Sequence, residues 1–98
     1  MPRSIALLLG ILCLVGCRGA PVQEMSDARQ AIEAARVAGA AERSPQDLQA
    51  AQQEIASAQR HLEAQEYARA RDAALEAKRR AAMALSNSEH GPESEDNP

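Results

Sequence analysis

Residues 67–85 read YARARDAALEAKRRAAMAL, and this stretch decides the fold. Alanine is the best helix former, and Leu, Arg, Lys and Glu follow it closely, so the composition favours an α-helix. Small residues recur at spacings of three and four, which places them on one side of that helix. This stripe consists of Tyr67, Ala70, Ala74, Ala77, Ala81 and Ala84, and we expect Leu75, Ala82 and Leu85 to widen its buried face.

A second stripe of the same spacing precedes it and consists of Leu48, Ala51, Ile55, Ala58 and Leu62. The helix that carries it has a clear beginning at Ser44-Pro45-Gln46-Asp47. Ser44 is expected to cap the amide of Asp47, and Pro45 suits a first turn that needs no amide. Asp47 adds negative charge at the positive end of the helix dipole. The sequence therefore predicts a helix over residues 45–64.

The junction between these two stripes leaves an alternative open. The step from Leu62 to Tyr67 is five residues, so the apolar stripe shifts its phase there. Either a tight turn at residues 64–67 or a stutter in one continuous helix explains the shift. We favour the turn. An earlier helix over 23–38 is predicted by the spacing of Met25, Ala28, Ile32 and Ala35, and Gly39 is its expected stop.

The predicted architecture is all-α, a small antiparallel bundle of about three helices over 23–38, 45–64 and 66–86. Short connections place consecutive helices side by side, as a helical hairpin plus an N-terminal helix. The core is thin, because the chain has one tyrosine and no Phe or Trp. Residues 87–98 hold four carboxylates and no Lys or Arg, which predicts a disordered acidic tail after the helical domain at 23–86.

The first residues have the three-part layout of a secretory signal. Arg3 provides a positive charge, and an apolar run from Ile5 to Val15 is interrupted only by Gly10. This run is shorter than the ~20 residues that a membrane-spanning helix needs. It ends in Leu14-Val15-Gly16-Cys17, which resembles the lipobox of bacterial lipoprotein precursors.

This resemblance implies that residues 1–16 are a lipoprotein signal peptide, cleaved between Gly16 and Cys17. It also implies a diacylglyceryl thioether on Cys17, a further acyl chain on its new amino group, and a lipidated tether over 17–22. Two or more chains anchor a protein stably in membrane lipid, where one does not. A Cys13–Cys17 disulfide and a chance cysteine are the alternatives. Because Arg18 rather than aspartate follows, resemblance to enterobacterial lipoproteins favours the outer membrane, facing the periplasm.

The helical region also carries a family resemblance. The segments ARQAIEAARVAGA, SPQDLQAAQQEIASAQ and LEAQEYARARDAALEAKRRAA lie within residues 26–85. They resemble the bacterial lipoprotein domain called domain of unknown function 4398 and, more loosely, a tetratricopeptide-type helix pair. Such domains commonly place Gly-Asp or Gly-Asn before the tyrosine, where this chain has Gln65-Glu66. The resemblance implies a small helical periplasmic lipoprotein with no assigned biochemical role.

Candidates for catalysis are few. His61 lies near Glu63, and His90 lies in the expected tail, but there is no H-E-x-x-H pattern, Cys/His cluster or glycine-rich phosphate loop. We therefore predict that the chain is not an enzyme and has no metal, cofactor or small-molecule substrate. The net charge of -3 gives no basic footprint for nucleic acid.

The basic stretch Lys78-Arg79-Arg80, with Arg69 and Arg71 before it, has two interpretations. It could contact lipid phosphates, lipopolysaccharide or an acidic partner. Alternatively it is a solvated face in which Glu76 and Arg80 form an i,i+4 pair. Residues 17–85 contain ten basic and ten acidic side chains, and this balance favours the solvated face.

Two functional classes follow from these observations. The first is a lipid-anchored, non-catalytic interaction or structural module that offers an alanine-lined groove to a partner helix. The second is a self-associating coiled-coil lipoprotein, comparable in layout to murein lipoprotein. That family is joined to peptidoglycan through a final lysine, whereas this sequence ends Asp96-Asn97-Pro98, so no covalent attachment is expected. We favour the first class.

Overall fold

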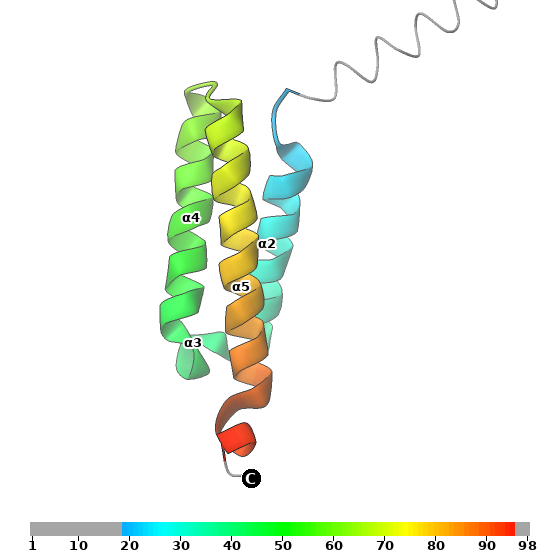
Figure 1. Ribbon diagram of the computed structural model, residues 1–98, viewed down its shortest axis with the longest axis vertical. Helices are drawn as coiled ribbons and strands as arrows, with labels where there is room; N and C mark the ends of the chain where they lie inside the picture. Colours follow the sequence, from blue (N-terminus) through cyan, green and yellow to red (C-terminus); the bar gives the residue numbers. More distant parts are fainter. Residues whose placement is uncertain (1–18, 96–98) are drawn as a thin grey trace, which may run out of the picture.

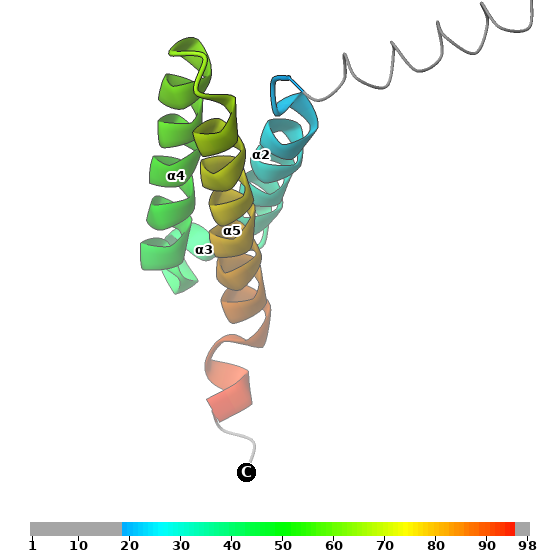
Figure 2. The same cartoon turned by 45° about the horizontal axis from the view of Figure 1, so that its top comes forward.

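The computed structural model describes residues 19–95, which form four helices. These are α2 (Val22–Val37), α3 (Ala40–Arg43), α4 (Pro45–Glu63) and α5 (Tyr67–Glu95). Figure 1 shows that α2 and α5 run in the same direction and that α4 runs opposite to both. α5 contacts α2 and α4 much more extensively than these two contact each other (Figure 2). The predicted all-α antiparallel bundle is confirmed, with the one-turn α3 as an additional element.

The core is built around alanine residues of α5, which we call the alanine seam. Its members are Ala70, Ala73, Ala74, Ala77, Ala81 and Ala84, each at most 8% exposed. Met25 packs near Ala73 and Ala74 at one end, while Ile32 and Leu48 pack near Ala81 at the other. Ile55 of α4 packs against both groups. Small side chains let the three helix backbones approach closely, so few large residues are needed to fill the interior.

The expected widening of this face by Leu75 and Ala82 is wrong. Leu75 is 49% exposed, and Ala82 is also exposed. Leu75 lies two residues from Ala77, which turns it about 160° around the helix and away from α2 and α4. Leu85 is half-buried against the core, as expected, and Tyr67 at the start of the stripe stays 37% exposed.

The predicted helix boundaries around α3 hold, but one capping contact does not. Gly39 adopts the left-handed conformation (φ 88°) after α2, and its amide donates to the Arg36 carbonyl at 3.0 Å. α4 begins at Pro45 with Ser44 as N-cap residue, but Ser44 makes no side-chain capping bond. Its hydroxyl instead donates to the Asp47 carboxylate at 3.1 Å. The Ser44 oxygen accepts from the Asn87 side-chain amide at 3.5 Å rather than from a backbone amide of α4.

The junction between α4 and α5 is a tight turn, which confirms the favoured alternative. The Glu66 amide donates to the His61 carbonyl at 2.8 Å, and the Gln65 amide donates to the Leu62 carbonyl at 3.0 Å. These two bonds form a Schellman motif, in which the residue after the C-cap Ala64 must be left-handed. That residue is Gln65, with φ 61°. A glutamine therefore occupies a position where glycine is usually preferred.

We expect Gln65→Gly to stabilise the fold. A non-glycine residue in the left-handed region costs roughly 1–2 kcal/mol, part of which is offset because glycine loses more entropy on folding. A net gain of about 0.5–1 kcal/mol would raise the melting temperature by several degrees in a domain of this size. The measurement is thermal unfolding followed by circular dichroism. The control Gln53→Gly lies at an exposed position within α4 and should lower the melting temperature instead.

α5 extends beyond the predicted helix end at residue 86, so the expected tail begins too early. Ser88 is fully buried, and its hydroxyl donates to the Ala84 carbonyl at 2.7 Å. Arg43 donates to the Ser88 carbonyl at 2.9 Å, and Asn87 donates to the Asp47 carboxylate at the same distance. These contacts with α3 and α4 hold the additional turn. Residues 96–98 of the predicted tail lie outside the described residues.

Candidate functional site

The predicted lipobox, Leu14, Val15, Gly16 and Cys17, lies outside the described residues. The structure does describe how the chain enters the bundle two residues later. The Arg71 guanidinium donates to the Gly19 carbonyl at 3.3 Å and forms an ion pair with Glu24 at 3.5 Å. Pro21 is fully buried. We call Gly19, Glu24 and Arg71 the N-terminal clasp, because they tie the first described residues to α2 and α5.

The α4–α5 turn lies at the same end of the bundle as the start of α2 (Figure 1). His61 Nδ1 lies 2.9 Å from Glu66 Oε1. Because an ionised carboxylate only accepts hydrogen bonds, the Nδ1 of His61 must be the donor. This bond, with Arg69 at 3.5 Å, lowers the pKa of Glu66 below its ordinary value of 4.5. His61 is half-buried. Its carbonyl accepts from the Glu66 amide and its ring bonds to the Glu66 carboxylate, so both contacts close the turn.

The His61–Glu66 bond predicts a local pH dependence. Since the pKa of Glu66 is lowered in the folded state, the stabilising contribution is present above the ordinary value of 4.5 and is lost as the pH falls through the folded-state pKa. We expect His61→Ala to raise the pKa of Glu66, because it removes the largest cause of the shift. Carboxyl ¹³C NMR titration measures this directly. His90→Ala is the matched control and should leave the Glu66 titration unchanged.

The basic stretch of α5 forms ion pairs within the bundle. Glu76 accepts from Arg79 Nε at 2.9 Å and from Arg80 Nε at 3.1 Å, and Arg80 also approaches Asp47 of α4 at 3.9 Å. The hydrogen bond from Arg79 is the main cause that lowers the pKa of Glu76. The expected Glu76–Arg80 pair is therefore confirmed. Both arginines share one carboxylate, which favours the solvated face over an open cationic site.

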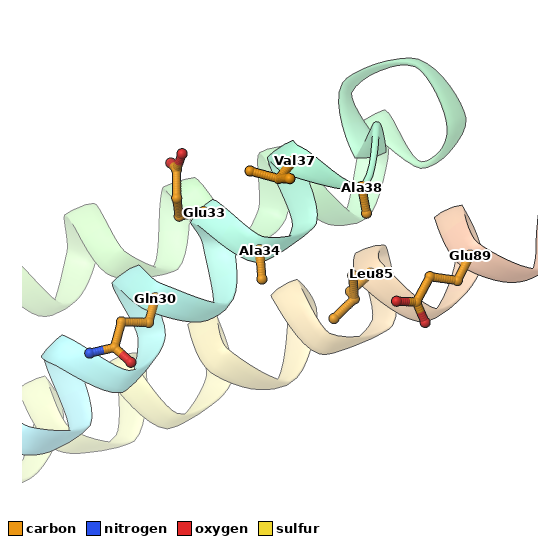
Figure 3. Close-up of a pocket in the computed structure, with 7 residues that line it drawn as sticks. All are labelled: Gln30, Glu33, Ala34, Val37, Ala38, Leu85 and Glu89. Carbon is orange, nitrogen blue, oxygen red and sulfur yellow. The ribbon is translucent and has the colours of Figure 1, made fainter.

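A shallow groove of about 550 Å³ lies between the second half of α2 and α5 (Figure 3). Ala34 and Val37 line it from α2, Ala38 lines it from the residue after that helix, and Leu85 lines it from α5. Gln30, Glu33 and Glu89 form its polar surroundings. Val37 is 81% exposed, so the groove is open and apolar at its centre. The sequence predicted an alanine-lined groove but not its position, because Val37 lies outside the predicted stripe of its helix.

The structure does not assemble the remaining candidates into a reactive centre. His61 lies at the turn and His90 lies beyond the buried Ser88 on α5. Among the described residues, no three His, Cys, Asp or Glu side chains lie close enough together to hold a metal ion. Within residues 19–95, no helix combines the length and apolar character needed to cross a bilayer. The N-terminal clasp was missed by the sequence interpretation, since its residues are far apart in the chain.

The helical region matches a known protein family. The family model for a domain of unknown function, DUF4398, matches residues 23–96, which include α3 to α5 and all of α2 except its first residue. No curated protein matches the chain. No solved structure matches it either.

Proposed function

This chain belongs to the family of the domain of unknown function DUF4398, and from that premise we propose that it is a lipid-anchored lipoprotein of the cell envelope. Its helical domain serves as a non-catalytic interaction or structural module. Cys17 carries the lipid after cleavage behind Gly16. The residue that follows, Arg18 rather than aspartate, favours the outer membrane, with the domain facing the periplasm. The lipobox resemblance of Leu14 to Cys17 supports the anchor.

The observation that carries the proposal is the position at which the folded domain begins. The clasp already holds Gly19 to Arg71, two residues after Cys17. The contacts of the folded domain therefore begin within the predicted tether over 17–22, close to the proposed lipid site. The buried residues that join α2, α4 and α5 all come after Cys17, from Met25 onward. Cleavage behind Gly16 and a lipid on Cys17 would thus leave the bundle intact and attached.

The bundle also favours the module over the self-associating coiled coil. The stripes that a coiled coil would present, on α4 and α5, are already buried against each other and against α2. Self-association would have to use other surfaces. The groove at Val37 and Leu85 is an open apolar surface through which the domain, as a non-catalytic module, could bind a partner.

Mass spectrometry of the protein isolated from cell membranes tests the anchor. The expected N-terminal peptide begins at Cys17 and carries the added mass of a diacylglyceryl group and an acyl chain. The matched measurement is the chain isolated after inhibition of the lipoprotein signal peptidase, which should retain residues 1–16. An N-terminal peptide with an unmodified Cys17 thiol would overturn the proposal.

A further inference from the structure

One end of the bundle lies close to the proposed lipid, because the intervening chain is very short. An extended chain spans at most about 3.6 Å per residue, so two residues place Gly19 within roughly 7 Å of Cys17. The Arg71 guanidinium holds the Gly19 carbonyl, and Pro21 is buried. The bundle cannot move away from the bilayer on a long tether.

The surface at this end is suited to lipid headgroups. α2 begins there with Val22, which is 69% exposed, and α5 begins there with Tyr67, which is 37% exposed. A tyrosine ring combines an apolar body with a polar hydroxyl, which is the combination favoured at the boundary between lipid and water. Ala64 and Ala68 beside the turn are also exposed, so the surface is small and unobstructed.

The charges at this end are largely balanced among themselves. Glu24 pairs with Arg71, and Glu66 pairs with His61 and Arg69. Arg60 and Glu63 near the end of α4 add one exposed charge of each sign. Asp72 beside Arg71 adds one more exposed carboxylate, so the charges at this end sum to near zero and only weakly oppose its approach to headgroup phosphates.

We propose that this end of the bundle, formed by the start of α2 and the α4–α5 turn, rests directly on the phospholipid headgroups of the anchoring bilayer. Val22 and Tyr67 are its contact residues. This inference rests on the proposed lipid anchor at Cys17 and adds an orientation, in which the helices stand upright on the membrane. The rival orientation places the outer face of α5 on the bilayer, because Leu75 and Met83 are also exposed.

The chain contains no tryptophan, so a single introduced tryptophan reports on one position. The mature lipidated protein would be reconstituted in vesicles of phosphatidylethanolamine and phosphatidylglycerol that contain a headgroup-labelled nitroxide lipid. Three variants are compared. Tyr67→Trp lies at the turn, Leu75→Trp lies on the outer face of α5, and Gln46→Trp lies in the exposed first turn of α4 at the opposite end. Circular dichroism checks that each variant keeps its helical content.

We expect a several-fold stronger quenching, with a blue-shifted emission, for Tyr67→Trp than for Leu75→Trp or Gln46→Trp. Equal quenching at positions 67 and 75 would mean that the bundle lies on its side, and equal quenching at 67 and 46 would mean that it stands off the surface. Either result overturns the orientation. Flotation of the vesicles and the mass of the Cys17 peptide separate these results from a failed anchor, in which the protein neither floats nor carries lipid.

Discussion

Cys17→Ser is expected to abolish lipid attachment completely. A serine hydroxyl is a much weaker nucleophile than a cysteine thiolate, so it does not accept the diacylglyceryl group. Without that modification the lipoprotein signal peptidase has no substrate, and residues 1–16 stay attached. Labelled palmitate should disappear from the protein, and the band on a gel should migrate as the longer precursor.

Cys13→Ser is the matched control for this experiment. Cys13 lies four residues earlier, within the apolar run that the proposed cleavage removes. Its replacement should leave palmitate labelling and processing unchanged. If Cys17→Ser keeps both the label and the mature mobility, the anchor is not at Cys17. If Cys13→Ser loses both, the two cysteines act together, and the alternative of a disulfide returns.

Among the substitutions described here, Ala81→Leu is expected to lower the free energy of unfolding most. Ala81 is fully buried in the alanine seam, between Ile32 of α2 and Leu48 of α4. Three additional carbon atoms there force the helices apart, and overpacking of this kind costs typically 1–3 kcal/mol. In a domain of 60–100 residues, each 1 kcal/mol lowers the melting temperature by about 4–8 °C. Thermal unfolding followed by circular dichroism measures the change.

Ala82→Leu provides the comparison, because it makes the same chemical change one residue along the same helix. Ala82 is exposed, so the larger side chain has room and both residues have similar helix propensity. Its melting temperature should stay close to that of the unaltered chain. Equal destabilisation by the two substitutions would show that α5 does not present the alanine seam to α2 and α4.

The helices and their order were predictable from the sequence, since spacing and caps act over a few residues. The stripe from Ala70 to Ala84 and the stops at Gly39 and residues 64–66 depend only on local geometry. The face of α5 was harder to delimit, because alanine occurs on both its buried and its exposed sides. The spacing therefore placed Ala82 on the buried face and left out Ala73. In the structure Ala73 is buried and Ala82 is exposed.

The contacts that fix the two ends of the bundle could not be predicted in the same way. Arg71 meets Gly19 across 52 positions, and Asn87 meets Asp47 across 40. No local pattern relates such residues, and each of these side chains has an ordinary role on a solvated helix surface. The proposed lipid site differs, because its prediction rests on four adjacent residues and on no tertiary contact.

Because α2 and α5 run in the same direction, the last turns of α5 lie far from the end at which the chain enters the bundle. From Tyr67 to Ser88, α5 rises about 1.5 Å per residue, so it lifts Glu89 roughly 30 Å above the end where the chain enters. A Debye length is ~8 Å at physiological salt, so at that height the Glu89 carboxylate is screened from the charge of a surface at the entry end. The parallel helices therefore keep Glu89 at a fixed distance from that end, beyond the electrostatic reach of a surface placed there.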